Sequence, residues 1–278
     1  MKTKYFFKRL FCVLFIGLVG VSCSENIGGQ ATSGKVITGE VTDVEAFSAV
    51  LHGKINIDVL MYDKVQFGFM ISESKESLSN HIGREYEVKT LIGQEYKLKI
   101  ELKPDSKCYY CAWLKLNGVQ YEFGDIKEFE TLAVVAPSSG YVDLGLSVKW
   151  NGVNEGADSP EGYGDFYDYD RAVSKFGNNL PTSEQWEELQ EECYWQETTH
   201  KGVDGYKVIA PNGKSIFLPA AGYRNCDGDV YGVGWYGEYW SSTPYGSDDA
   251  FDFYWDLNVI SRDHIDRCNG LSVRLVRN

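Results

Sequence analysis

The residue types with the most distinctive chemistry in this chain are its seven cysteines. Cys108 and Cys111 form a C-x-x-C pair, a spacing found in redox centres and zinc sites. Their segment alternates as a β-strand does, so residues three apart lie about 10 Å from each other on opposite faces. A disulfide needs α-carbons within about 7 Å, and no second C-x-x-C or paired histidine completes a zinc site. We therefore expect both thiols to pack as ordinary buried side chains.

Two further cysteines, Cys226 and Cys268, lie in polar, loop-like strings, Arg-Asn-Cys-Asp-Gly and Asp-Arg-Cys-Asn-Gly. In an exported chain these two can form a disulfide, which would restrain a loop-rich domain. Two free thiols are the other outcome, and the sequence leaves both open.

Acidic side chains near these loops are the only candidates for a metal site. Carboxylates supply the oxygen ligands that calcium prefers. The calcium candidates are Asp227, Asp229, Asp248, Asp249 and Asp252. The spacing of an EF-hand is absent, so the alternative is a set of solvated acidic loops. The prediction is that the protein has no metal and no cofactor.

Catalytic signatures are lacking. The four histidines are scattered, without a G-x-S-x-G string or a recognisable partner spacing. Paired carboxylates for glycoside hydrolysis depend on a separation in space, which the sequence does not give. We expect the protein not to be an enzyme.

Aromatic side chains crowd one glycine-rich region of the second half. Such side chains stack on sugar rings or anchor a protein partner when they are exposed. Tyr239-Trp240 and the alternating Phe251, Phe253 and Trp255 are expected to pack inward. The ligand-binding candidates are Tyr231, Trp235 and Tyr236, beside the Asp227–Asp229 loop, and Arg262 in a later loop.

The chain divides into two parts that differ in residue pattern. Residues 36–132 carry short stretches of period two, with Asn117-Gly118 as a hairpin turn, and about seven strands fit there. This describes a β-sandwich. Residues 133–140 are small and contain proline, as in a linker. Residues 141–278 interleave glycine with aromatics and contain two short helices, near 169–176 and after Thr182, which begins a capping box with Gln185.

The first residues indicate export. Lys2, Lys4, Lys8 and Arg9 precede the apolar run 10–21, which is of secretory length and too short to span a bilayer comfortably. Gly20-Val-Ser-Cys23 follows and resembles the lipobox of bacterial lipoproteins, with Gly20 in place of the usual leucine. The resemblance implies a signal peptide of residues 1–22, acylation of Cys23 and attachment to a lipid membrane. The alternative is an ordinary signal peptide and a secreted protein.

Composition supports an extracytoplasmic, globular protein. Removal of residues 1–22 takes away four basic and no acidic side chains, so the formal charge of -13 becomes -17. Nucleic acid is excluded as a partner because phosphate binding needs clustered basic residues. Residues 23–35 are small and polar, as in a flexible spacer. The sequence leaves the oligomeric state open.

Two strings resemble known modules. Leu102-Lys-Pro-Asp-Ser-Lys-Cys108-Tyr-Tyr110 resembles the L-x-P-x-T-x-Y-Y signature of fibronectin type III-like domains. Cys108 stands at the first tyrosine position, so the tyrosine-corner hydrogen bond would have to come from Tyr109 or Tyr110. This resemblance implies a fibronectin type III-like sandwich for residues 36–132.

The strings of the second half are similar to the Fibrobacter succinogenes major paralogous domain of surface lipoproteins. They are Val142-Asp-Leu-Gly-Leu-Ser-Val-Lys-Trp150, Leu180-Pro-Thr182, Asn212–Gly222, Tyr239-Trp-Ser-Ser242 and Gly270–Val276. That family is similar to the C-type lectin-like fold and to formylglycine-generating enzymes, whose two C-terminal cysteines are matched here by Cys268 alone. The resemblance implies an α+β domain at 141–278 and an outer-membrane, surface location.

Together these observations predict a mainly β chain with an α+β second domain. We expect a surface-exposed lipoprotein whose sandwich is a spacer and whose C-terminal domain binds an extracellular glycan or protein. An extracytoplasmic enzyme acting on polysaccharide and a structural component of a surface assembly are the alternatives. Two buried carboxylates that face a cleft would favour the enzyme.

Overall fold

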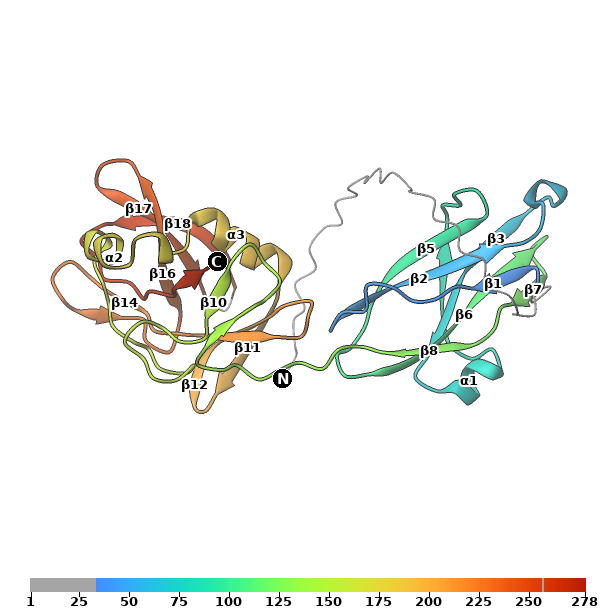
Figure 1. Cartoon of the computed structure of the whole chain (residues 1–278), viewed down its shortest axis with the longest axis horizontal. Coiled ribbons are helices and arrows are strands. Elements are labelled where there is room, and N and C mark those ends of the chain that lie inside the picture. The colour runs from blue at the N-terminus through green and yellow to red at the C-terminus, as the bar shows by residue number, and fades with distance from the viewer. Residues whose placement is uncertain (1–33, 257) are drawn as a thin grey trace. The chain divides into compact units, whose positions relative to one another are not determined.

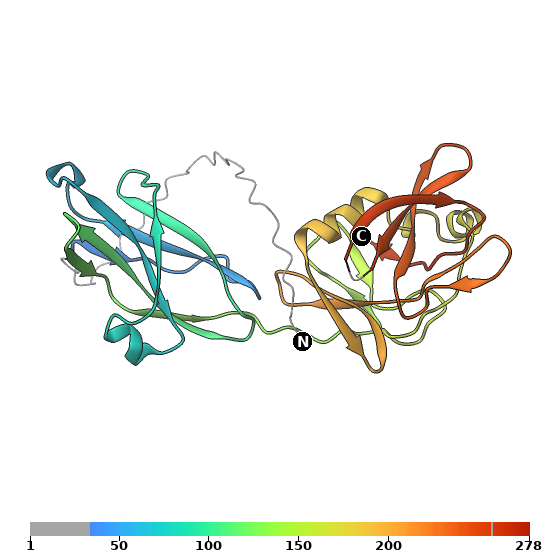
Figure 2. The same cartoon turned by 180° about the vertical axis from the view of Figure 1, so that it is seen from behind.

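The structure is a computed structural model that describes residues 34–256 and 258–278 (Figure 1, and Figure 2 from behind). The basic segment, the apolar run, Cys23 and the spacer up to residue 33 lie outside the described residues. Within the described part of the chain, no helix is long and apolar enough to cross a membrane. The chain is mainly β.

The N-terminal domain is built from two antiparallel sheets. The first has the order β1-β2-β5, and the second β4-β3-β6-β7, with β8 pairing the start of β6. The bounds are β1 Val36–Thr38, β2 Ser48–Ile55, β3 Val65–Ser72, β4 Arg84–Val88, β5 Glu95–Glu101, β6 Lys107–Leu116, β7 Gln120–Phe123 and β8 Lys127–Glu130. Two short helices, η1 Val59–Met61 and α1 Lys75–Ser79, lie in the connections.

One apolar core joins the two sheets, so this domain is a β-sandwich. Alternate residues of β2 turn inward, and Leu51 is fully buried. Phe69 and Tyr110 meet them from β3 and β6. Asn117 and Gly118 both have positive φ and close the hairpin between β6 and β7, as the sequence predicts. The fibronectin-like alternation thus has its physical cause in burial of one face per strand.

Strand β6 separates the C-x-x-C pair. Cys108 faces the sandwich core, whereas Cys111 packs with Met70, Leu78 and Trp113 on the outer face of the sheet. Both thiols are free, and burial raises the pKa of Cys111 to about 11. They are therefore packing residues.

Strand β6 also contains Tyr110, one of the two tyrosines expected to supply the tyrosine-corner hydrogen bond. The Tyr110 hydroxyl donates to the Gly39 carbonyl (2.9 Å), which is 71 residues away in the sequence. This bond ties β6 to the segment after β1, so it is not a local corner within one turn.

The C-terminal domain consists of four small antiparallel sheets and two α-helices. The sheets have the orders β19-β10-β9, β11-β12-β13, β14-β15 and β16-β17-β18. Their bounds are β9 Tyr141–Val142, β10 Lys149–Asn151, β11 Tyr194–His200, β12 Val203–Ile209, β13 Ser215–Pro219, β14 Tyr223–Arg224, β15 Val230–Tyr231, β16 Gly237–Tyr245, β17 Asp249–Trp255, β18 Ile260–Asp266 and β19 Val276–Arg277. The helices are α2 Tyr169–Phe176, followed by η2 Gly177–Asn179, and α3 Ser183–Glu192.

Helix α3 begins where the sequence predicts. The Gln185 backbone N–H donates to the Thr182 hydroxyl (3.3 Å), and the Thr182 backbone N–H donates to the Gln185 side chain (2.9 Å). This reciprocal capping box satisfies two N–H groups that the helix leaves free. Trp186 and Leu189 are buried on its inner side, and Cys193 caps the C-terminal end.

Two cores lie on opposite faces of the sheet β16-β17-β18. Tyr239 and Phe253 face the core of helix α3, where Trp186 stacks on Phe253 with ring centroids 4.8 Å apart. Trp240 and Ala250 face the core of helix α2. Packing on both faces positions this sheet firmly, and the sheet carries the residues discussed next.

Candidate ligand-binding site

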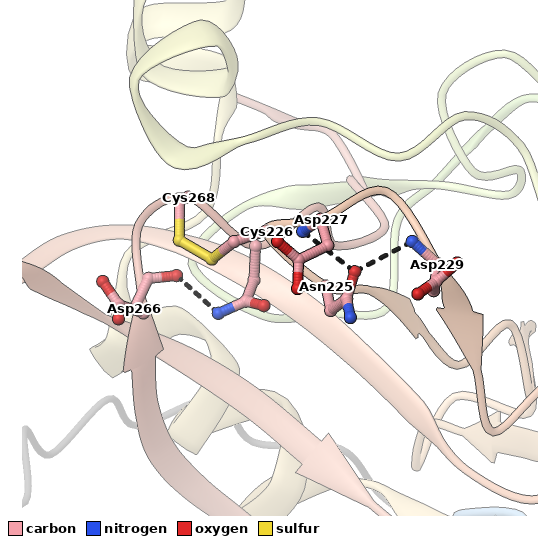
Figure 3. Close-up of a disulfide and its surroundings, with 7 residues drawn as sticks. Asn225, Cys226, Asp227, Asp229, Asp266 and Cys268 are labelled. Atoms are coloured by element: carbon pink, nitrogen blue, oxygen red, sulfur yellow. Dashed lines mark hydrogen bonds between the residues drawn. A yellow bond between two sulfur atoms is a disulfide. The ribbon is translucent and has the colours of Figure 1, made fainter.

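The loop between β14 and β15 is shaped by one side chain, Asn225. Its side-chain oxygen accepts hydrogen bonds from the backbone N–H groups of Asp227 (3.0 Å) and Asp229 (2.8 Å), as Figure 3 shows. Asparagine favours such turns because its short side chain replaces a backbone acceptor. The turn therefore holds Cys226 in a defined place.

Cys226 forms a disulfide with Cys268, which follows strand β18 (Figure 3). The two α-carbons are 5.0 Å apart, and the bridge closes a separation of 42 residues. Asn269 beside it donates to the Asp266 carbonyl (3.0 Å). The bridge joins the loop after β14 to the turn after β18, beside the antiparallel pair in which the backbone N–H groups of Arg224 and Gly270 each donate to the carbonyl of the other (2.8 and 2.7 Å).

The calcium candidates do not form a site. Asp227 and Asp229 are exposed, while the Asp249 carboxylate contacts His264 (3.1 Å). Among residues 34–256 and 258–278, no group of three or more His, Cys, Asp or Glu side chains could hold a metal ion. Asp227, Asp229 and Asp248 are exposed loop residues, whereas Asp249 is the half-buried first residue of strand β17.

An exposed apolar surface continues from β15. Tyr231 is 48% exposed and Trp235 is 73% exposed, and the side chains of Val230 and Val233 between and beside them are similarly open. We call these four residues the loop patch. The loop is fixed by its backbone, because the Trp235 N–H donates to the Gly232 carbonyl (2.9 Å). The patch therefore presents two predicted binding residues on an ordered loop.

A series of tyrosines leads from the loop patch onto the sheet. Ring centroids are 5.9 Å apart between Tyr231 and Tyr223, 6.4 Å between Tyr223 and Tyr236, and 5.6 Å between Tyr236 and Tyr254. These separations are typical of interacting aromatic rings. Tyr236, a predicted binding residue, is half-buried within this tyrosine series and serves to connect it.

Two buried carboxyl groups lie where the tyrosine series ends. Glu238 of β16 is directly opposite Tyr254, and Asp252 of β17 is directly opposite Trp240. Opposed residues share a face of the sheet, so both carboxyls lie on the Tyr254 side. Glu238 is 8% exposed and Asp252 is 3% exposed, and one oxygen of each has no hydrogen-bond partner among the described residues.

The environment of this carboxyl pair disfavours ionisation. Burial is the main cause that raises the pKa of Glu238 to about 7 and that of Asp252 to about 8, and the negative Asp263 on β18 adds to both. A hollow of about 180 Å³ opens beside them. It is lined by Glu238, Asp252, Tyr254, Asp263, His264 and Ile265.

Sequence reasoning named Asp252 only as a calcium ligand candidate and missed Glu238. Asp252 interrupts the aromatic run Ala250–Trp255, and Glu238 immediately precedes Tyr239-Trp240. An acid inside an apolar strand was the available signal. It is weak because alternation alone places such an acid on a solvated face, whereas here both faces of the sheet are covered.

Arg262 does not join this site. It is opposite Phe253 in the pairing of β17 with β18, and it forms an ion pair with Glu187 of helix α3 (2.8 Å). Its guanidinium lies 4.7 Å from the centre of the Phe251 ring. The sequence analysis placed it in a later loop, but it lies in strand β18, whose register directs its side chain to the face opposite the carboxyl pair.

A second hollow, of about 350 Å³, lies near helix α2. Its lining includes Asp165 and the basic residues Arg171 and Arg224. The Arg171 guanidinium lies 5.2 Å from the centre of the Tyr167 ring. This hollow holds charges of both signs, and its arginines are not buried, so it is a less specific site than the carboxyl pair.

Comparisons with known proteins give one family match. A model described as a domain of unknown function (DUF8237) matches residues 165–276, which include the loop patch and the carboxyl pair. A comparison with curated proteins finds no significant match.

Solved structures give further likenesses. Two structures of the sensor domain of the anti-sigma factor RsgI4 from Pseudobacteroides cellulosolvens are 12% and 15% identical, each covering 38% of this chain and 100% and 81% of theirs, with TM-scores of 0.29 and 0.30. A fibronectin type III domain of the human KIAA0970 protein is 18% identical and covers 42% of this chain and 99% of its own, with a TM-score of 0.26.

Proposed function

We propose that this protein is an exported lipoprotein whose C-terminal domain binds an extracellular ligand through the loop patch. The observation that carries the proposal is the exposure of Trp235, Tyr231, Val230 and Val233 on one ordered loop. Burial of an exposed tryptophan on binding contributes more than that of most side chains, and such residues form hot spots. Solvent-exposed apolar clusters of this kind mark interaction sites.

The composition of the loop patch favours a protein ligand over a glycan. Sugar rings stack on flat aromatic faces, which Trp235 and Tyr231 supply. The two valines offer no such face, but they fit the apolar core of a protein interface. A glycan remains the second ligand class, and the test below separates the two.

The same proposal includes a fold family and a role for each of the two domains. The two-sheet sandwich supports a fibronectin type III-like spacer. The strings from Val142 to Val276 support a lectin-like, major paralogous domain that presents the loop patch. The lipobox-like string before Cys23 supports an anchor in the outer membrane. Metabolic lipid labelling that fails to label the wild-type chain would leave the secreted form.

The test of ligand binding uses residues 24–278 on arrays of extracellular proteins and glycans. We expect a protein ligand whose binding falls at least tenfold in Trp235→Ala, with the fold intact by circular dichroism. Tyr245→Ala is the matched control, because Tyr245 is 44% exposed on strand β16 outside the loop patch. Full binding by Trp235→Ala would refute the loop patch as the binding surface.

A polysaccharide hydrolase is a second candidate, and one observation favours it. Glu238 and Asp252 are buried carboxyl groups with raised pKa values beside a hollow, a combination used by general acids. The hollow is small for a sugar chain, since sites for drug-sized ligands hold about 300–1,000 Å³. Release of reducing ends from a polysaccharide panel, abolished in Glu238→Gln, would establish this activity instead.

A further inference from the structure

We propose that the hollow lined by Glu238 and Asp252 receives the guanidinium group of an arginine side chain presented by the bound protein. This inference rests on the proposed function, since it names the kind of protein that the C-terminal domain binds. The loop patch would hold the apolar part of the partner, and the hollow would hold one basic side chain.

The size of the hollow fits a single side-chain end. Its volume of about 180 Å³ lies below the range of about 300–1,000 Å³ for whole small-molecule sites. Tyr254 and Ile265 contribute an aromatic ring and an apolar group to its lining. A cation gains further energy over an aromatic face, and arginine does so more often than lysine. A methylene stem with a planar cationic end matches this lining.

The chemistry of the hollow calls for a donor that carries positive charge. The Glu238 and Asp252 carboxyls are more than nine-tenths buried, and each has an oxygen without a hydrogen-bond partner in the described part of the chain. Buried polar atoms are normally paired, and a buried carboxylate is costly unless a cation compensates it. A guanidinium brings five N–H donors in a planar fork that suits carboxylates.

The charges around the pair all have the sign that attracts a cation. Besides burial, Asp263 raises the pKa of Glu238, and both Glu238 and Asp263 raise that of Asp252. Arg262 is the basic side chain on the neighbouring strand, and its ion pair with Glu187 holds it on the other face. The titratable groups that face the pair or line the hollow are Glu238, Asp252, Asp263, Tyr254, Tyr236 and His264.

A series of neighbouring aromatic rings connects the hollow to the loop patch. Tyr254 lines the hollow, and the rings of Tyr236 and Tyr223 connect it to Tyr231 of the loop patch. Tyrosine, tryptophan and arginine are the residues enriched at the centres of protein interfaces. The formal charge of -13 for the whole chain also favours encounter with a basic partner.

A guanidinium would bind better to the ionised pair, so binding should release protons. Below pH 6 both carboxyls are mainly protonated, and above pH 8 mainly ionised. Since arginine keeps its charge over this range, its affinity is expected to rise with pH. The expected gain between pH 6 and pH 8.5 is at least tenfold.

The experiment measures binding of acetyl-arginine methylamide to residues 24–278 by NMR titration of the side-chain carboxyl carbons. Acetyl-citrulline methylamide is the neutral probe of the same shape, and acetyl-lysine methylamide carries an ammonium instead. We expect saturable arginine binding in the millimolar range, and at least tenfold weaker binding of the other two probes. A neutral cello-oligosaccharide should not displace arginine.

Variants locate the site. Glu238→Gln and Asp252→Asn should each weaken arginine binding at least tenfold and reduce its pH dependence, because one titrating carboxyl remains. Glu187→Gln is the matched control, because it removes the same charge on the opposite face of the sheet and should change the affinity less than twofold. Thermal unfolding of each variant checks that the fold is kept.

Several outcomes would overturn the inference. These are equal binding of arginine and citrulline, equal binding of arginine and lysine, displacement by the oligosaccharide, an effect of Glu187→Gln as large as that of Glu238→Gln, or no saturable binding up to 50 mM probe. None of these outcomes changes the interpretation of the Trp235→Ala result on the arrays. If the arrays show no ligand while the arginine probe binds as expected, arginine binding in the hollow is supported and ligand binding through the loop patch is refuted.

Discussion

The sandwich and the C-terminal domain differ in how many buried polar side-chain atoms lack a hydrogen-bond partner. Among the described residues, nine side chains have a buried polar atom without a partner. One of them, Trp113, belongs to the sandwich, and the other eight belong to the C-terminal domain. In the sandwich, alternating strands direct polar side chains to water and apolar ones to a single core. The C-terminal domain covers both faces of strands β16 and β17, so Glu238 and Asp252 are buried there, whereas the polar side chains of the outer strand β18 stay exposed.

This difference directs the search for ligand contacts to the second domain. A protein retains an unsatisfied buried group only if other interactions offset the cost or if the group has a task. In the sandwich, Trp113 is the one such side chain among the described residues. Glu238 and Asp252 are the unsatisfied groups that also reach a hollow, which is why they are the strongest candidates for contact with a ligand.

The largest expected effect is a loss of stability in one domain when a side chain of its own core is truncated. Leu51→Ala empties a fully buried site in the sandwich and should lower its free energy of unfolding by about 2–5 kcal/mol. Trp113 is the sandwich's one tryptophan, so its fluorescence after Trp-to-Phe replacement of the other six reports this domain alone. Leu189→Ala in helix α3 is the matched control and should act on the C-terminal transition. One shared transition in both variants would contradict the separation of the cores.

The next effect concerns the disulfide. Replacement of both Cys226 and Cys268 by serine should lower the stability of the C-terminal domain by about 2–4 kcal/mol, because the bridge closes a loop of 42 residues. Chemical denaturation measures this change. A reductant should reproduce it in the wild type and leave the sandwich transition in place, since Cys108 and Cys111 are free thiols. A reductant effect on the sandwich alone would be evidence against this assignment.

The smallest effect is a dependence of stability on pH. Glu238 has a folded-state pKa of about 7, above its ordinary 4.5, so the folded state holds the proton more tightly between these values. Stability is unaffected below pH 4.5, falls as pH rises to 7, and stays lower above it. Glu238→Gln should recover roughly 2–3 kcal/mol at pH 8 and nothing at pH 4.

Urea denaturation at both pH values measures this difference. In the sandwich, Lys35 lowers the pKa of Glu122, so Glu122→Gln is the contrasting control: the ion pair it removes favours stability at neutral pH and is lost as pH falls. An equal effect of Glu238→Gln at pH 4 and pH 8 would show that the carboxyl does not titrate in this range.

Local signals in the sequence predicted much of the fold. Asn117-Gly118 closes a hairpin because both residues tolerate positive φ, and Thr182 with Gln185 caps a helix because their side chains replace missing backbone partners. Such features depend on a few neighbouring residues. The double coverage of strand β16 depends instead on helices that lie far away in the sequence, so it could not be predicted from alternation.

The same distinction applies to the candidate site. Exposed Trp235 and Tyr231 followed from glycine-rich loop composition, and the structure places both on the surface. Tyr236 proved to be a connecting ring, and Arg262 lies on the opposite face because a strand sends successive side chains to opposite sides. Glu238 and Asp252 come together through the pairing of two strands, which composition does not reveal.

The Cys226–Cys268 bridge makes the shape of the binding loop dependent on the compartment in which the chain folds. Thiols stay reduced in a cytoplasm, whereas periplasm and exterior permit oxidation. The sandwich, which contains no bridge, forms without oxidation, whereas the bridge beside the β14–β15 loop closes only under oxidising conditions. If the chain is exported as proposed, formation of this bridge is a maturation step that precedes contact with an extracellular ligand.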